Sequence, residues 1–143
     1  MAKKNLENKL LAVVRVRGRA GTRQSVTETL NRLNLRRVNN MVLVFGTKSN
    51  IGMIHKCNDF VTFGEIQGDV LAKLIKSKEL PIKAEAQEEL MKGKITGKDV
   101  NGISPIRMHP PKRGYEGIKR AFVVKGALGY RGEKINDLIK RMM

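Results

Sequence analysis

The sequence predicts an α+β protein in which a three-stranded sheet is backed by helices. Three short segments, residues 10–17, 41–45 and 60–63, have the length and the aliphatic, β-branched or aromatic content typical of strands. The residues between and after them repeat apolar side chains at helical spacing. With 41% hydrophobic residues in 143, the chain is large enough for one domain with a real core, with or without an appendage.

The first strand leads directly into a run of arginines. Residues 10–23 read LLAVVRVRGRAGTR, an apolar strand followed by a loop with two glycines. Because side chains alternate across a strand, Arg15 and Arg17 are expected on one face, with Val14 and Val16 on the other. Arg19 and Arg23 follow on the loop. The inner face of this strand would contribute apolar side chains to the core. Its end and the following loop would hold a fixed set of cations against a polyanion.

A helix is predicted over residues 25–34. Ser25 and Glu28 have the spacing of a capping box, in which each side chain accepts from a main-chain amide of the first turn. Apolar residues then recur at helical spacing for about three turns. Arg36 and Arg37 are expected in the connection that follows. The prediction is therefore an exposed basic link between the first helix and the second strand.

The second strand, residues 41–45, is apolar throughout, which predicts that helices or loops cover both of its faces. Residues 46–58 are expected to form a loop with about one helical turn at residues 51–54. This loop carries the basic side chains Lys48, His55 and Lys56. The third strand, residues 60–63, is expected to end at Gly64.

The middle of the chain is predicted to be helical. Val70, Leu71, Leu74 and Ile75 define one apolar face of a helix that Pro81 should stop. A second short helix is expected over residues 84–91, followed by loop or cap material at residues 96–99. A closing helix is expected near the C-terminus, with its apolar stripe at Ile135, Leu138, Ile139 and Met142.

Residues 104–120, SPIRMHPPKRGYEGIKR, form a second basic stretch. The prolines forbid a helix, and two glycines make turns. The stretch carries one acid and six basic side chains: Arg107, His109, Lys112, Arg113, Lys119 and Arg120. Tyr115 either stacks on a ligand or packs against the core. A short strand is expected at residues 121–124.

The charge of the chain is large and uneven. The formal net charge is +16 and the isoelectric point is near 10.4. Residues 1–58 carry a net charge of +10, residues 59–104 of −1 and residues 105–143 of +7. Such an excess points to nucleic acid as the partner. An anionic membrane fits less well, because residues 133–143, the best candidate for an amphipathic helix, carry only three cations.

Aromatic residues make up only 4% of the chain, which is too few for an array that stacks successive unpaired bases. We therefore expect recognition of folded RNA by its shape and backbone. Gly126-Ala-Leu-Gly129 matches the GXXG of RNA-binding KH domains, but the flanking helix pair is missing and a simple turn is the preferred interpretation.

The sequence gives little support to an enzyme. His55, Cys57 and Asp59 alternate, but nothing completes a catalytic triad or an oxyanion site. Cys57 is expected to be a small buried residue, and as the only cysteine it allows no internal disulfide. His109 is expected to contact phosphate or ribose, or to pack. No metal, cofactor or small-molecule substrate is predicted, and no secretion signal or membrane span, so we expect a soluble intracellular protein.

Three blocks carry a resemblance to a known family: VRVRGRAGTRQSVTETLNRLNLRRVNNMVLV, GMIHKCNDFVTFGE and RMHPPKRGYEGIKRAFV. They resemble ribosomal protein L-thirty of the large subunit, in its long archaeal-type form, whose eukaryotic counterpart is called L-seven. The resemblance covers roughly residues 10–142. The short bacterial form would correspond only to about residues 10–64.

The resemblance implies a ferredoxin-like fold with a three-stranded antiparallel core, residues 1–64. A C-terminal helical and irregular extension, residues 65–143, would pack on this core and carry the basic loop 104–120. The implied role is structural, in the large subunit of the cytoplasmic ribosome. The implied partners are other ribosomal proteins and the large rRNA in the neighbourhood of the 5S rRNA. No membrane partner is implied.

Together the charge pattern and the resemblance predict the RNA-binding side chains. They are Arg15, Arg17, Arg19, Arg23, Arg36, Arg37, Lys48, His55, Lys56, Arg107, His109, Lys112, Arg113, Tyr115, Lys119 and Arg120. An alternative stays open: a free-standing RNA chaperone or regulatory RNA-binding protein, which would form a pool outside ribosomes.

Overall fold

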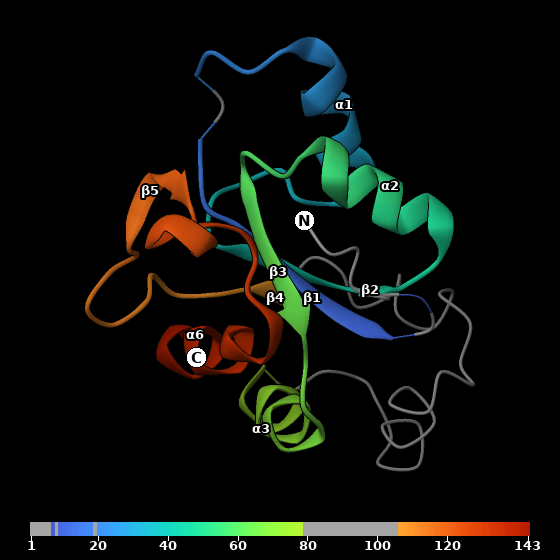
Figure 1. Cartoon of the computed structure of the whole chain (residues 1–143). Coiled ribbons are helices and arrows are strands. Elements are labelled where there is room, and N and C mark those ends of the chain that lie inside the picture. The colour runs from blue at the N-terminus through green and yellow to red at the C-terminus, as the bar shows by residue number, and fades with distance from the viewer. Residues whose placement is uncertain (1–6, 8, 19, 79–105) are drawn as a thin grey trace.

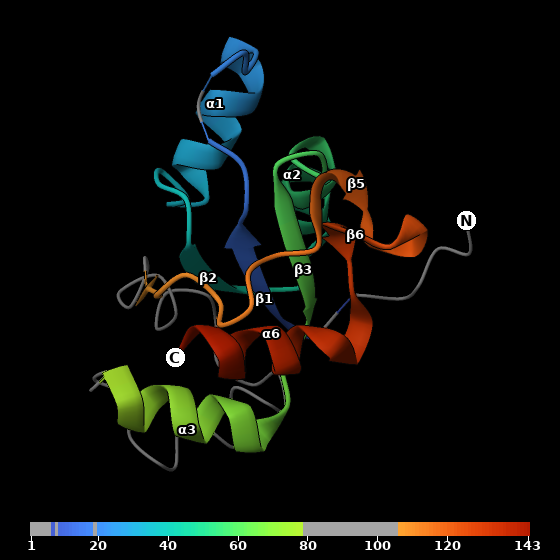
Figure 2. The same ribbon diagram turned by 90° about the vertical axis from the view of Figure 1, so that its left-hand side faces the viewer.

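The computed structural model describes residues 7, 9–18, 20–78 and 106–143. It consists of one sheet with helices on both faces, so the α+β prediction is confirmed. Figures 1 and 2 show α1 and α2 on one side of the sheet and α3 and α6 on the other. Apolar side chains from each helical layer meet the sheet in a separate core.

The centre of the sheet is formed by β1 (Leu10–Arg15), β2 (Asn40–Phe45) and β3 (Val61–Glu65). β1 lies between the other two and is antiparallel to both. Leu10 faces Phe45, and Arg15 faces Val61. These strands match the three expected from sequence, and their antiparallel order agrees with the ferredoxin-like core.

The sheet has six strands, in the order β4-β2-β1-β3-β6-β5, where three were predicted. β4 (Ile106–Arg107) pairs antiparallel with β2, and β6 (Gly126–Tyr130) pairs parallel with β3. β5 (Gly117–Ala121) adds the outer edge beside β6. The additional strands escaped prediction because they are short and rich in glycine or charged residues, and only pairing with a preformed neighbour makes them strands.

One face of the sheet is covered by α1 (Gln24–Arg32) and α2 (Lys48–Lys56). Leu30 and Ile54 of these helices pack with Val13 and Phe63 of the strands. α2 has nine residues, longer than the single turn expected, and Thr47 accepts a hydrogen bond from the amide of Asn50 at its start. The apolar side chains of α2 pack on the sheet, and this packing stabilises the longer helix.

The capping box predicted at Ser25 is absent. α1 begins one residue earlier, with Arg23 at the N-cap and no side-chain cap bond. Ser25 therefore lies inside the first turn, where its carbonyl accepts from the Thr29 hydroxyl. Glu28 accepts instead from the Gln24 side chain, at 3.5 Å.

The other face is covered by α3 (Gly68–Lys78) and α6 (Ile135–Met142), both at predicted positions. Leu71 and Leu74 of α3 and Leu138 of α6 pack against Ala12 and Val14 of β1. Because helices cover both sides, β1 is buried along its whole length and not on one face alone. It also ends at Arg15, two residues earlier than expected.

Glycine decides where two of the elements approach each other. β3 continues through Gly64, where a strand end was expected. Only glycine fits at this position, because a side chain would collide with the Gly132 carbonyl and lie 2.9 Å from Ile135 Cβ. Gly126 likewise lies against the main chain of Arg120. Residues 126–129 form part of β6, so the expectation of a turn at the GXXG is wrong.

Residues 122–124 form a 3-10 turn, η1 (Phe122–Val124), where a strand was expected. A second such turn, η2 (Gly132–Lys134), leads into α6. The expected helix at residues 84–91 and loop at 96–99, like Arg19 and the start of the basic loop, lie outside the described residues. No helix in the described part of the chain is long and apolar enough to cross a membrane.

Candidate nucleic-acid interface

The strand registers bring the two basic stretches to one end of the sheet. Arg15, the last residue of β1, faces Val61, the first residue of β3. Asn40, the first residue of β2, faces Arg107, the last residue of β4. The parallel pairing of β6 with β3 places the beginning of β6 at this end as well. Connections that lie far apart in the chain therefore emerge side by side.

We call this region the basic end and define it by segments 16–18, 20–23, 33–39, 55–60 and 107–125. It holds eleven exposed or half-buried lysines and arginines: Arg17, Arg23, Arg36, Arg37, Lys56, Arg107, Lys112, Arg113, Lys119, Arg120 and Lys125. The acids in these segments are Asp59 and Glu116. The opposite end is mixed among the described residues, with Lys9 and Lys48 near Glu7, Glu65 and Asp69. Positive charge is thus concentrated at one end of the strands.

Arg15 does not belong to the exposed set, contrary to the expectation from strand alternation. Its exposed fraction is 2%, in a strand that is buried along its whole length. Its Nη1 donates to the Leu35 carbonyl at 2.7 Å, and its Nε donates to the Arg17 carbonyl at 2.9 Å. Arg15 therefore ties the connection after α1 to the end of β1. It positions the basic end from within.

Arg17 is half-buried, and its main chain is fixed by the turn that precedes β3. Its amide donates to the Phe60 carbonyl at 3.2 Å, and its guanidinium lies 5.3 Å from the centre of the Phe60 ring. A long bond of 3.5 Å runs to the Asp59 carbonyl. Arg23, Arg36 and Arg37 are exposed on the neighbouring connections. These four arginines present positive charge to solvent.

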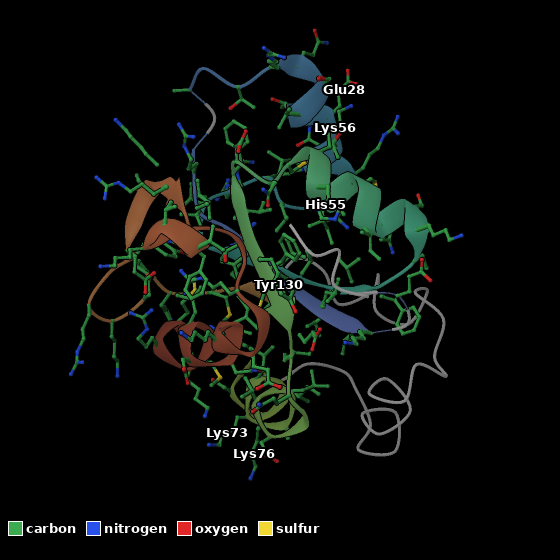
Figure 3. The ribbon with its side chains drawn as sticks, in the orientation of Figure 1. Glu28, His55, Lys56, Lys73, Lys76 and Tyr130 are labelled. Atoms are coloured by element: carbon green, nitrogen blue, oxygen red, sulfur yellow. The ribbon has the colours of Figure 1, made fainter. Side chains whose placement is uncertain are left out.

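The cations predicted on residues 46–58 separate in space. His55 and Lys56 are exposed in the last turn of α2, next to the start of β3, and join the basic end. Figure 3 shows both on α2. The His55 ring packs edge-on against Phe63, with ring centres 6.0 Å apart. Lys48 begins α2 and lies at the opposite, mixed end.

The loop after β4 is built on the C-terminus of α6. The amides of His109 and Lys112 donate to the carbonyls of Met142 and Arg141, at 3.0 and 3.1 Å. Arg141 donates in return to the carbonyls of Lys112 and Gly114, both at 3.3 Å. The loop thus satisfies carbonyls that a helix end leaves without partners. It holds Lys112 and Arg113 exposed on an ordered turn.

Glu116, the acid of the basic stretch, is engaged by two arginines. Its Oε2 accepts from Arg131 Nη2 at 2.7 Å, and its Oε1 lies 3.6 Å from Arg141 Nη2. Burial acts to raise the pKa of Glu116, but the hydrogen bond and charge of Arg131, with the charge of Arg141, outweigh it and lower the pKa. Arg131 is itself buried and also donates to Thr62 Oγ1 at 2.8 Å. This network fixes β5 and the loop against β3 and β6.

Tyr115 packs within the protein, which favours the packing interpretation over stacking on a ligand. It is half-buried, and its hydroxyl donates to Asn39 Oδ1 at 2.6 Å. Burial raises the pKa of Tyr115 to about 12. Asn39 has a left-handed φ of 67°, so this bond joins the loop to a tight turn before β2. Tyr115, like Arg15, positions the connections of the basic end.

His55, Cys57 and Asp59 do not share the face that a strand would have given them. They span the end of α2 and the turn that follows it. Cys57 is fully buried in the core under α1 and α2, as expected. Burial raises the pKa of its thiol to about 11, so the reactive thiolate is rare near neutral pH. No group of three or more potential metal ligands occurs in the described ranges.

Three basic residues in or next to the basic end were not predicted from the sequence. Lys125 joins the exposed set from a left-handed turn with a φ of 63°. The available signal in the sequence was a lysine between Val124 and Gly126, a position typical of an exposed turn. Arg131 and Arg141 act inside the network around Glu116, which no local pattern reveals because their partners lie on other elements.

Comparison with known proteins supports the resemblance read from the sequence. The family model described as ribosomal protein L30p/L7e matches residues 11–61, from β1 to the start of β3. Large ribosomal subunit protein uL30 of Methanococcus maripaludis (strain S2) is 42% identical, over 92% of this chain and 98% of its own length. The proteins of the same name from Thermoplasma volcanium and Methanosphaera stadtmanae are 37% and 34% identical, each over 94% of this chain.

Proposed function

Because the chain belongs to the ribosomal protein L30p/L7e family, we propose that it is a non-enzymatic constituent of the large ribosomal subunit that binds rRNA through its basic end. Its role would be to neutralise phosphates where RNA segments pack closely and to fix their relative geometry. We place it in the cytoplasmic ribosome, next to other ribosomal proteins and near the 5S rRNA. The proposal includes no cofactor and no small-molecule substrate.

The observation that carries the proposal is the concentration of cations at one end of the sheet. Eleven lysines and arginines surround Asp59 and Glu116, and Glu116 is already engaged by Arg131 and Arg141. Arginine and lysine held on ordered loops match the spaced negative charges of an RNA backbone. Because the loops are tied to the fold by main-chain bonds, binding would order few new groups.

The proposed contacts are the exposed and half-buried basic side chains of this end. They are Arg17, Arg23, Arg36, Arg37, His55, Lys56, Arg107, His109, Lys112, Arg113, Lys119, Arg120 and Lys125. Arg15 and Tyr115 are assigned to positioning because both are engaged inside the protein. Lys48 would need a separate RNA segment at the opposite end. Arg19 stays in the proposed set on the sequence pattern alone.

The test compares two double variants with equal loss of charge. K112A/R113A removes two cations of the basic end, and K73A/K76A removes two from the outer face of α3, shown in Figure 3 on the opposite side of the molecule from Lys56. The affinity of each for deproteinised archaeal large-subunit rRNA is measured over a range of salt concentrations. We expect K112A/R113A to reduce the slope of log K against log salt by roughly 1.4–1.8, since each phosphate contact contributes about 0.7–0.9.

K73A/K76A should leave that slope at its wild-type value. Equal reductions in the two variants would show that the whole surface contributes nonspecifically and would contradict the assignment of the basic end. Proximity to the 5S rRNA is tested separately, by crosslinking the protein in purified ribosomes and mapping the attached nucleotides. Crosslinks confined to large-rRNA regions remote from the 5S rRNA would contradict that part of the proposal.

A further inference from the structure

An apolar tip projects from the outer edge of the sheet. Val123 is 71% exposed and Val124 59%, the two largest values among the exposed large hydrophobic residues of the described chain. Ile118 on the neighbouring strand β5 is 46% exposed. Figure 2 shows the turn that carries the valines standing out from the side of the sheet next to β5 and β6. We call Ile118, Val123 and Val124 the apolar tip.

The apolar tip is held in place by its own turn. Phe122 lies beneath the guanidinium of Arg131, 5.0 Å from the ring centre, and the ammonium of Lys134 lies 5.5 Å from the same ring. Lys125 closes the turn with a bond from its amide to the Phe122 carbonyl at 3.2 Å. Gly126 then lets β6 approach the main chain of Arg120. The valines are therefore presented outward by a fixed structure.

The charge around the tip is positive. Lys119, Arg120 and Lys125 are exposed within a few residues of the valines. The nearest acid in sequence is Glu116, which Arg131 and Arg141 already engage. A ligand that fits this surface carries negative charge next to a flat or rounded apolar face. An unpaired nucleotide combines both in one unit, whereas a protein partner would need an apolar patch with an acidic rim.

We propose that the apolar tip binds an unpaired nucleotide of the rRNA. The base packs on Val123 and Val124, and the adjoining phosphates pair with Lys119, Arg120 and Lys125. Proteins commonly read RNA at loops and bulges, where unstacked bases are accessible. This inference rests on the proposed function and adds one base contact to an interface otherwise directed at the backbone.

The first test separates apolar from ionic contributions to affinity. V123S/V124S keeps the charge, so it should weaken binding to deproteinised archaeal large-subunit rRNA about tenfold without changing the salt slope. K119Q keeps the tip, so it should reduce the slope by roughly 0.7–0.9. V123I/V124I preserves the apolar character and should bind like the wild type. Because both valines are exposed, urea midpoints of these variants should stay at the wild-type value.

The second test reads the base directly. Dimethyl sulfate probing of the same complex should show an unpaired base that the wild type protects and V123S/V124S leaves reactive. Unchanged affinity and protection in V123S/V124S, with a wild type that binds in a salt-dependent manner, would overturn the nucleotide site and leave the proposed function intact. Failure of the wild type itself to bind rRNA would overturn both.

A protein partner is the remaining outcome. In that case V123S/V124S would bind deproteinised rRNA like the wild type but would be recovered at lower occupancy in reconstituted large subunits. This result would also overturn the nucleotide site, and it would assign the apolar tip to a contact with a neighbouring ribosomal protein.

Discussion

At the scale of single residues, arginines of the same stretch take opposite roles. Arg15 and Arg17 are two positions apart, yet Arg15 is buried with its guanidinium on main-chain carbonyls and Arg17 reaches the surface. Arg131 and Arg141 belong with Arg15, since they hold Glu116 and the loop main chain. Burial therefore divides the cations into those that position loops and those free to meet a ligand.

Replacing Arg15 with methionine should destabilise the fold. The substitution keeps an apolar stem but removes the donors to the carbonyls of Leu35 and Arg17. Losing charged donors to buried acceptors costs on the order of 2–3 kcal/mol. We expect a loss of that size in the free energy of unfolding, measured by urea titration. Arg36→Met, at an exposed position, should stay within about 0.5 kcal/mol of the wild type.

These two variants also separate stability from binding. Arg36→Met should reduce the salt slope of rRNA binding, because its charge faces solvent at the basic end. A normal unfolding curve for Arg15→Met would contradict its positioning role.

Stability should fall in acid because of Glu116. Its pKa is lower in the folded protein than its ordinary value of 4.5, so the unfolded state binds more protons between the two values. The stabilising contribution is present above pH 4.5 and is lost as the pH falls through the folded pKa. Urea unfolding between pH 6 and pH 3 should show this decline, and Glu116→Gln should flatten part of it. An identical pH profile in Glu116→Gln would refute the assignment.

At the scale of elements, close contact between β3 and the start of α6 depends on a missing side chain. Gly64 lies against the Gly132 carbonyl and Ile135. Asn136 of α6 adds two hydrogen bonds to the segment that begins at the end of β3. Its Oδ1 accepts from the Gln67 amide at 2.9 Å, and its Nδ2 donates to the Glu65 carbonyl at 3.1 Å. The C-terminal helix is therefore fixed on the sheet by one tight contact and one buried amide.

Gly64→Ala should be destabilising, because a Cβ has no room and the main chain of η2 must move. Overpacking of this kind costs about 1–3 kcal/mol. Gly52→Ala provides the matched control, since Gly52 lies in α2 with open space around it and alanine favours a helix by roughly 0.5–1 kcal/mol. Urea titration should move the two midpoints in opposite directions. A urea midpoint for Gly64→Ala at or above that of the wild type would contradict the close contact between β3 and the start of α6.

At the scale of the whole molecule, the two halves of the chain complete one sheet. Residues beyond 64 supply β4 at one edge, β6 and β5 at the other, and both helices of the second face. We propose that residues 1–64 form the RNA-binding core and that residues 65–143 act as an extension on which this core depends. The basic end is itself shared, because segments 107–125 come from the extension.

A fragment of residues 1–64 should not unfold cooperatively. Without α3 and α6, the apolar face formed by Ala12, Val14, Met41 and Leu43 would be exposed to water. We expect strong binding of a hydrophobic dye and a broad urea transition, whereas the full chain should give a single sharp transition. A cooperative fragment with a wild-type midpoint would show that the core is independent of the extension.

The sequence by itself determined the three central strands, α1, α3 and α6, the concentration of positive charge in two segments and the family. Each of these depends on local composition, periodicity or spaced blocks, which the chain carries without reference to distant contacts. The basic residue types of the basic end were therefore predictable from the sequence. Which of these side chains are exposed was not, because exposure depends on distant contacts.

Only the tertiary structure decided the six-stranded sheet, the burial of Arg15 and Arg131, and the meeting of both basic stretches at one end of the strands. β4, β5 and β6 are strands because neighbouring strands supply their hydrogen-bond partners. Arg15 is internal because its guanidinium donates to the carbonyls of Leu35 and Arg17, which come from the connection after α1 and the end of β1. The physical reason is the same in each case: long-range pairing and packing assign partners to groups whose local sequence leaves several environments open.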